Sequence, residues 1–434
     1  MKKVAFVTLG CKVNQYDTDG MRGLFLAAGY EEAPFDSTAD IYVINTCSVT
    51  HMGERKSRQL IYRAKKQNEQ AVIVVTGCYA QLAPELIAAI EGVNIVIGTN
   101  ERHQIVSLVE EYLADSDKHV RTAVHNVREY NRFEELPLYP MAISHTRAHL
   151  KIQEGCNNFC SYCIIPYTRG KLKSREIPHI VEEANRLVAH GFKELVLTGI
   201  HLGAYGLDLP DRPALADVVE ALLQQTKAER IRLGSIESVE VSEKLIRLIN
   251  EEERMCPHLH LPIQSGSNPI LKAMNRHYTK EQFITLIEEL RERIPDLAVT
   301  TDVIAGFPGE SDELFEETLE TVRQLGFSHI HAFPYSARQG TPAAAMKEQI
   351  PEAVKKERVR QLNQVSEEGQ ERYQKSLIGK TVAVLVEKVE NNIAEGFSEQ
   401  YIRVQFPASE EAAGHIVRAA IKGIENGTLI GEPV

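Results

Sequence analysis

Three of the seven cysteines in this 434-residue chain lie close together, as Cys156, Cys160 and Cys163. Their C-x3-C-x2-C spacing places three thiolates on one loop, where they can hold three irons of a cubane cluster and leave the fourth iron open to a cofactor. The alternative is a zinc knuckle, for which His145 or His149 would supply the fourth ligand. Because the unequal spacing is unusual for zinc, we favour the cluster.

Three further cysteines, Cys11, Cys47 and Cys78, are distant in sequence, but each follows an apolar run that predicts a strand. In a parallel sheet the carboxyl ends of all strands meet at one edge, so these thiols should converge. The alternative is three unrelated cysteines, each buried as a small hydrophobic residue. Their equivalent positions favour a second cluster with an open iron. Cys256 is left over, and we assign it to the core.

Polar, glycine-bearing segments end several strands in the middle of the chain. Thr198-Gly199 and Gln264-Ser265 each follow an apolar run, and a third run ends in Ala305-Gly306. Each segment alone is an ordinary turn. If the strands form a barrel, however, the segments share one rim, which is where such folds bind cofactors.

Basic residues gather in two stretches, each beside a predicted cluster site. Such runs are usually solvated faces, but this placement favours a nucleic-acid substrate. The first stretch comprises Arg147, Lys151, Arg169, Lys171, Lys173 and Arg175, and the second Arg55, Lys56, Arg58, Arg63, Lys65 and Lys66.

The overall composition limits the class of protein. The 60 acidic residues outnumber the 49 basic ones, giving a net charge of −11, which argues against a protein that coats nucleic acid. With 43% hydrophobic and 25% charged residues the chain is typical of globular proteins, and no apolar run is long enough to cross a membrane. The first apolar run is also too short for a signal peptide, so we expect a cytoplasmic protein.

The periodicity of apolar residues predicts an α/β protein of three units. Strand and helix patterns alternate from 1 to 114, which predicts a parallel α/β domain, and 115–141 is expected to be a linker. Six further strand–helix repeats within 142–372 predict a partial (βα)6 barrel. Short strands separated by turns in 373–434 predict a small all-β barrel. The six strands expected in the central unit are 149–153, 194–198, 230–235, 258–263, 298–304 and 328–334.

At these motifs the chain resembles the radical S-adenosylmethionine (SAM) methylthiotransferases. The three-cysteine motif with Tyr162 before its last cysteine is the signature of the radical SAM superfamily. Three further features narrow the resemblance to the methylthiotransferases: the amino-terminal triad, Glu154-Gly155-Cys156-Asn157 and the segment 165–170. Segments 8–15 and 261–267 are most similar to the MtaB branch. The resemblance extends over essentially the whole chain, and its terminal barrel would be a TRAM-like RNA-binding module.

The resemblance implies an activity. Members of the MtaB branch add a methylthio group to the adenine ring of N6-threonylcarbamoyladenosine at position 37 of tRNA, beside the anticodon. Sister branches act on isopentenyladenosine in tRNA or on an aspartate of a ribosomal protein, and these remain alternatives. An aromatic C–H has no acidic proton, so a cofactor must supply a radical. The implied cofactors are two [4Fe–4S] clusters and SAM, which serves as methyl donor and radical source.

The resemblance also implies site residues and partners. No acid–base residue is expected, because the chemistry lies on the clusters. The expected partners are the anticodon loop of tRNA and an electron donor of the flavodoxin or ferredoxin type, for a monomer that does not bind membranes. Arg169 and Lys171 are the candidates for RNA contact. The residues expected to bind SAM are Tyr162, Thr198, Gly199, Gln264, Ser265, Asp302, Ile304 and Gly306.

Two other functions compete with this one. An electron carrier with two clusters would not need the large βα region. A metal-containing RNA-binding protein would explain the basic stretches and the tail, but not two open three-cysteine sites.

Overall fold

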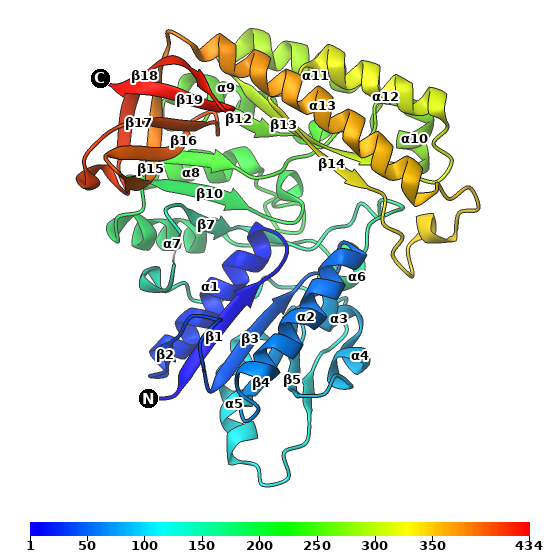
Figure 1. The fold of residues 1–434 in the computed structure, drawn as a ribbon, viewed down its shortest axis with the longest axis vertical. Helices are drawn as coiled ribbons and strands as arrows, with labels where there is room; N and C mark the ends of the chain where they lie inside the picture. Colours follow the sequence, from blue (N-terminus) through cyan, green and yellow to red (C-terminus); the bar gives the residue numbers. More distant parts are fainter. Residues whose placement is uncertain (144) are drawn as a thin grey trace.

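A computed structural model describes residues 1–143 and 145–434, and it divides into three packed units (Figure 1). The amino-terminal unit is a six-stranded sheet with the order β2-β1-β3-β4-β5-β6, and every neighbouring pair is parallel. The strands β3 and β4 are rich in Val and Ile and are buried along their whole length, as expected for central strands covered on both faces. The bounds are β1 Lys3–Thr8, β2 Glu31–Glu32, β3 Ile41–Thr46, β4 Val72–Gly77, β5 Val93–Ile97 and β6 Arg121–Ala123.

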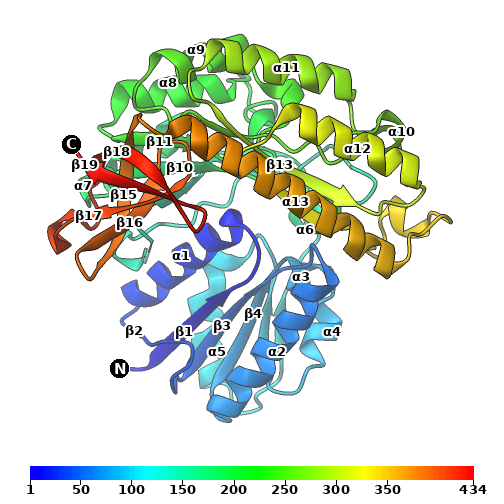
Figure 2. The same ribbon diagram turned by 45° about the horizontal axis from the view of Figure 1, so that its top comes forward.

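Helices cover the two faces of this sheet. Met21 and Phe25 of α1 pack on one face with Ile105 of α5, whereas Ile61 of α2 and Ile87 of α4 pack on the other. The carboxyl ends of the strands all point toward the central unit (Figure 2). The helices are α1 Lys12–Ala27, α2 His51–Gln67, α3 Cys78–Leu82, α4 Pro84–Ala88 and α5 Ile105–Ala114.

The expected linker from 115 to 141 is wrong at its beginning. Residues Arg121–Ala123 form β6, which pairs in parallel with β5 and completes the sheet. The strand has only three residues and lies among charged ones, so its sequence carries no apolar run that could have indicated it. Pairing with the neighbouring strand β5 stabilises this segment as a strand, although its own sequence does not favour one.

The central unit contains the six strands expected from the sequence. They form two parallel three-stranded ladders, β7-β10-β11 and β12-β13-β14, joined by single bridges from Ile231 to Met255 and from Ser235 to His260. This arrangement confirms the partial barrel. The strands are β7 Ala148–Lys151, β10 Glu194–Thr198, β11 Arg230–Leu233, β12 His258–His260, β13 Ala298–Ala305 and β14 His329–Pro334.

The two faces of these strands differ in polarity. Leu150, Leu195 and Ile231 point outward and pack under the helices, so the alternate residues point into the lumen. A short hairpin, β8 Gln153–Glu154 with β9 Lys173–Ser174, lies beside β7. The helices are α6 Ile165–Arg169, α7 Ile177–Ala189, α8 Leu215–Gln225, α9 Glu243–Glu251, α10 Asn268–Ala273, α11 Lys280–Arg293, α12 Asp312–Leu325 and α13 Glu352–Leu377.

The long helix α13 leads to a closed five-stranded barrel in the order β15-β16-β17-β19-β18, which confirms the all-β tail. The apolar runs at 381–388, 401–406 and 415–424 predict three strands, and β16 and β19 lie outside them. No helix of the described residues is long and apolar enough to cross a membrane. The strands are β15 Thr381–Glu390, β16 Ile393–Ser398, β17 Arg403–Pro407, β18 Ile416–Glu425 and β19 Thr428–Pro433.

The carboxyl-terminal barrel docks onto the amino ends of β10 and β11. Glu194 pairs with both Arg230 and Arg232, at 2.6 and 2.7 Å. Each arginine also donates to a backbone carbonyl of the barrel: Arg230 to Ala383 at 2.8 Å and Arg232 to Glu399 at 2.9 Å. All three charged side chains are buried, so the tail closes one end of the central lumen rather than hanging free.

Candidate active site

The amino-terminal cysteines converge at the carboxyl edge of the sheet. Cys11 follows β1, Cys47 follows β3, and Cys78 follows β4 as the first residue of α3. Gly10, with φ of 110°, brings the chain so close that an added Cβ would lie 3.3 Å from the Cys47 sulfur. Burial, followed by the negative charge of nearby Cys78, raises the pKa of Cys47 to about 11. The fold thus gathers three thiols from a stretch of 68 residues, and a bound metal would have to displace their protons.

The second triad occupies the loop between β8 and α6. The backbone N–H of Cys163 donates to the carbonyl of Cys160 at 2.9 Å, and the N–H of Asn158 donates to the Cys156 sulfur at 3.4 Å. Burial raises the pKa of Cys163 to about 12, and the charges of Cys160 and Cys156 act in the same direction. One tight loop therefore presents all three sulfurs, as the spacing predicted.

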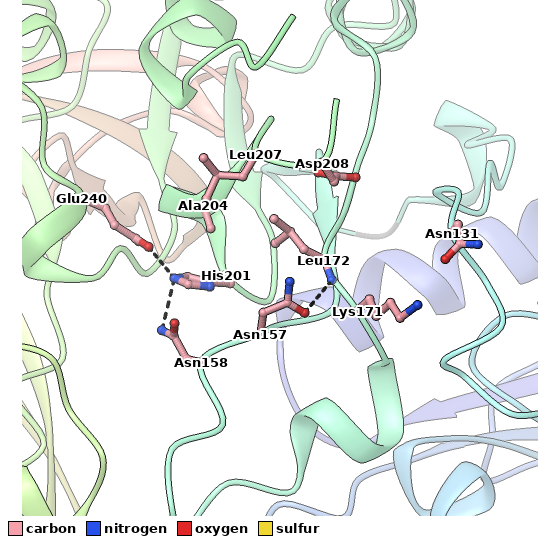
Figure 3. Close-up of a pocket in the computed structure, with 10 residues that line it drawn as sticks. All are labelled: Asn131, Asn157, Asn158, Lys171, Leu172, His201, Ala204, Leu207, Asp208 and Glu240. Carbon is pink, nitrogen blue, oxygen red and sulfur yellow. Dashed lines mark hydrogen bonds and ion pairs between the residues drawn. The ribbon is translucent and has the colours of Figure 1, made fainter. Parts of the chain in front are cut away.

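Two side chains from other loops, His201 and Arg276, contact these sulfurs. His201, which follows β10, lies 3.6 Å from the Cys156 sulfur, and its other ring nitrogen lies 2.5 Å from a Glu240 oxygen (Figure 3). Arg276 donates to the Cys160 sulfur at 3.4 Å and pairs with Glu237. The sequence reasoning missed all four residues. Only His201 carried a signal, because it stands two residues after the Thr198-Gly199 strand end.

A cavity of about 540 Å³ opens beside His201 and Asn158. Figure 3 shows Lys171 on its wall, next to Asn157, whose amide oxygen accepts from the backbone N–H of Leu172 at 3.3 Å. Lys171 is exposed and lines this cavity, so the residue predicted to contact RNA is accessible beside the core triad.

The prediction that Arg169 contacts RNA is wrong. Its side chain is fully buried and donates to Asp17 at 2.8 Å and to Glu154 at 3.1 Å. Lys151 joins the same two carboxylates, at 2.5 and 3.0 Å. Burial alone would raise the pKa of Glu154, but the charges of Arg169, Lys151 and Arg102 hold that pKa well below its usual range. The network joins α1 to the central unit and excludes solvent.

The two basic stretches differ in their exposure to solvent. In the first stretch Lys151, Arg169, Lys173 and Arg175 are all buried, so it is not a surface patch. Lys151 and Arg169 pair with Glu154 of the same stretch and with Asp17 of α1. Periodicity could not reveal Asp17 as a partner, because it comes from another segment. The second stretch does lie on helix α2, with exposed side chains at Arg55, Lys56, Arg63 and Lys66.

The residues expected to bind SAM lie along one end of the lumen. Thr198 ends β10 and Gly199 follows it, Gln264 lies beyond β12 with a φ of 63°, and Ile304 and Gly306 stand at the end of β13. Tyr162 and Ile304 pack against the same apolar cluster. These segments lie at the carboxyl ends of their strands, the same end of the lumen as the core triad loop.

Ser265 and Asp302, two of the residues expected to bind SAM, direct their side chains to other protein groups. The Ser265 hydroxyl is buried and lies 3.1 Å from the hydroxyl of Thr318 on α12, so only its backbone faces the rim. Asp302 lies deeper on β13, where its carboxylate is 3.4 Å from His260.

The zinc alternative that uses His145 or His149 as the fourth ligand finds no support in the geometry. His145 and His149 line a different cavity, together with Arg147, Arg232 and Tyr401. That cavity lies at the amino ends of the strands, whereas the triad follows their carboxyl ends.

Comparisons with known proteins agree with this architecture. Residues 3–98 match the uncharacterized protein family UPF0004, and residues 150–322 match the radical SAM superfamily. A solved structure of TsrM, a radical SAM methyltransferase from Kitasatospora setae, superposes with a TM-score of 0.57 at 15% identity, covering 79% of this chain and 75% of that one, which shows a shared fold. The class defined by the fold and the core triad is therefore that of the radical SAM enzymes.

Full-length relatives narrow the class. The threonylcarbamoyladenosine tRNA methylthiotransferase MtaB of Bacillus subtilis is 44% identical over 97% of this chain and 94% of its own length. The MtaB of Aquifex aeolicus is 41% identical, and the tRNA-2-methylthio-N(6)-dimethylallyladenosine synthase of B. subtilis is 36% identical over the whole of this chain and 86% of its own length. This chain belongs to the radical SAM methylthiotransferase family, whose cofactors include SAM and a [4Fe–4S] cluster.

Proposed function

We propose that this enzyme methylthiolates the adenine ring of N6-threonylcarbamoyladenosine next to the anticodon of tRNA, using a second [4Fe–4S] cluster on Cys11, Cys47 and Cys78. The observation that carries the proposal is the convergence of these three thiols at one sheet edge that faces the central unit. The substrate follows the greater identity to the MtaB relatives, at 44% and 41%, than to the dimethylallyladenosine synthase, at 36%.

The donor set supports a cluster on each triad. Three cysteine thiolates are the ligands that can hold three irons of a [4Fe–4S] cluster, and each triad supplies three free cysteines.

The protein's own residues bind, orient and exclude water around these groups. When bound, the clusters and SAM supply the one-electron and sulfur chemistry that no side chain can provide. Arg276 donates to a sulfur of the core triad, and Arg169 donates to a sulfur of the amino-terminal triad. Such hydrogen bonds to the ligand sulfurs would favour the reduced state of a cluster held at either triad. The buried network around Asp17 and Glu154 fixes the two units against each other, so the distance between the triads is set by the fold.

Three exposed features support tRNA as the partner. They are the basic face of α2, Lys171 beside the core triad, and the carboxyl-terminal barrel, which we propose acts as a TRAM-like module. We further propose that the enzyme is a cytoplasmic monomer that receives electrons from a flavodoxin or ferredoxin.

The experiment is anaerobic reconstitution of wild-type protein and of two triple variants, each with one cysteine triad changed to Ala. Wild type should bind about eight irons per chain and each variant about four, because each cubane holds four. Both variants should fail to methylthiolate tRNA carrying threonylcarbamoyladenosine, as read by mass spectrometry of its nucleosides. The amino-terminal variant should still release 5′-deoxyadenosine from SAM. Methylthiolation by that variant would overturn the proposal.

A further inference from the structure

A cavity of about 380 Å³ lies where the three units meet. The lumen faces of β12, β13 and β14 form one wall through His260, Thr300 and His331. The carboxyl-terminal barrel contributes Tyr401, and the amino-terminal unit contributes a single residue, Lys12, at the start of α1. A ligand in this cavity would therefore touch all three units at once.

The cavity lies beside the amino-terminal cysteine triad, at the amino ends of β12, β13 and β14. Lys12 directly follows Cys11, so the cavity begins one residue from the amino-terminal triad. On the opposite side, Thr300, Asp302 and Ile304 follow one another on the lumen face of β13. Ile304 and Tyr162, which directly precedes Cys163, pack against the same apolar cluster. The lumen face of β13 therefore leads from the cavity toward the core triad.

Lys12 brings a positive charge to the cavity. Within residues 1–143 and 145–434 its ammonium group forms no ion pair or hydrogen bond, and it lies 5.9 Å from the centroid of the Tyr401 ring. Glu194 acts on its charge, but that carboxylate already pairs with Arg230 and Arg232. The described residues that line the cavity include no Asp or Glu, and the other cationic one, Arg403, already pairs with Glu395 at 2.5 Å. An open cavity with one unpaired ammonium group favours an anion.

The same charge argues against a metal ion in the cavity. His260, Asp302 and His331 come within 4.8 Å of one another and have suitable ligand atoms. A divalent cation there would meet the Lys12 ammonium group across the cavity. Burial and the nearby His329 lower the pKa of His331 to about 4, so its ring is neutral at pH 7 and can donate or accept a hydrogen bond.

We propose that this cavity receives the N6 substituent of the substrate adenine and that Lys12 pairs with the carboxylate of its threonyl group, which makes Lys12 a specificity-determining residue. This inference rests on the proposed function. The neutral imidazole of His331 and the hydroxyl of Thr300 suit the substituent's carbamoyl and hydroxyl groups. A dimethylallyl substituent has no anion and would leave the Lys12 ammonium group unpaired in the cavity, which disfavours it.

The test compares Lys12→Met with wild type on two anticodon stem–loop RNAs. One carries threonylcarbamoyladenosine, and the other carries its methyl ester, which differs only in the lost charge. On the acid, Lys12→Met should lose roughly 10- to 100-fold in kcat/KM, mainly through KM, because a charge-assisted hydrogen bond is removed. On the ester, wild type and Lys12→Met should be equal. Lys12→Arg should retain most activity on the acid.

Two controls separate the inference from other roles of Lys12. Lys2→Met removes an exposed charge at the far end of β1 and should change neither substrate's kinetics. Iron content and 5′-deoxyadenosine release are measured for each variant, and Lys12→Gln is used if Lys12→Met fails to fold. An equal loss on acid and ester would assign Lys12 to an RNA phosphate or to support of Cys11, and would overturn the inference. If wild type leaves the acid RNA unmodified, the proposed function itself fails, and the ligand assignment fails with it.

Discussion

The guanidinium of Arg169 donates from Nε to the sulfur of Cys78 at 3.3 Å. Arg169 ends the helix that follows the core triad, whereas Cys78 belongs to the amino-terminal triad, so one side chain connects the two sites. The same guanidinium pairs with Asp17 and Glu154, which come from the two different units. The interface between the units and the environment of the amino-terminal triad are therefore one structure, and disturbing one should disturb the other.

Replacing Arg169 by Gln should destabilise the protein and its amino-terminal metal site together. Removing one partner of a buried ion pair costs ~3–5 kcal/mol, because the remaining charge stays buried. We expect a lower denaturation midpoint, and iron loss confined to the triad of Cys11, Cys47 and Cys78. Lys171→Gln is the matched control, because this neighbouring cation is exposed and should change the midpoint little. Normal iron and stability in Arg169→Gln would disprove the connection.

Glu194 should make the docking of the carboxyl-terminal barrel sensitive to acid. Burial opposes its charge, but Arg232, Arg230 and Arg147 hold its pKa well below the usual range. A depressed pKa adds stability above the unfolded value of about 4.3, and this stability is lost as the pH falls through the folded pKa. Glu194→Gln should therefore be less stable than wild type at pH 7, and the gap should shrink below about pH 4.

The measurement is the urea midpoint of both proteins between pH 3 and pH 7. Glu229→Gln serves as the control, since Glu229 forms a half-exposed pair with Lys193 at 2.5 Å. Such a pair contributes about 1 kcal/mol or less, so its gap to wild type should be small at every pH. A gap for Glu194→Gln that stays constant down to pH 3 would contradict the assignment.

Tyr401 should anchor the carboxyl-terminal barrel through its ring. The residue has a φ of 66°, its ring stacks on Phe397 at 4.9 Å, and the Arg232 guanidinium lies 4.8 Å from the ring centroid. Tyr401→Ala should lower stability by ~1–3 kcal/mol through lost packing and cation–π contact. Tyr401→Phe keeps the ring and should resemble wild type. Equal thermal midpoints for the Ala and Phe variants would show that the ring has no such role.

Cys256 should be dispensable for metal binding. It is buried beside Arg232, and burial raises the pKa of its thiol. Its backbone N–H donates to the Ile231 carbonyl at 3.0 Å, so its position is set by the strand. Cys256→Ala should keep all iron and full activity, with a stability loss of ~1 kcal/mol. Loss of four irons would show that Cys256 is a ligand after all.

The sequence by itself determined the three units and the two cysteine triads. Strand ends are recognisable from short apolar runs, and parallel strands must end at one edge, so Cys11, Cys47 and Cys78 could be grouped without coordinates. The core triad could be recognised without any strand prediction, because its three cysteines share one loop. The (βα)6 barrel followed from six repeats of one local pattern.

Only the tertiary structure decided what the charged residues do. Lys151, Arg169, Lys173 and Arg175 are a basic run in sequence, yet they are buried. Asp17 of α1 pairs with two of them, Glu183 pairs with Arg175, and Lys173 donates to Asn100, so most of their partners lie outside the run. The contacts of His201 and Arg276 with the core triad arise in the same way, from loops far along the chain. Lys12 differs from these cations in that it is exposed and forms no ion pair within the described residues. Sequence periodicity indicates on which side of a helix or strand a residue lies. The packing between units determines which partner the residue meets there.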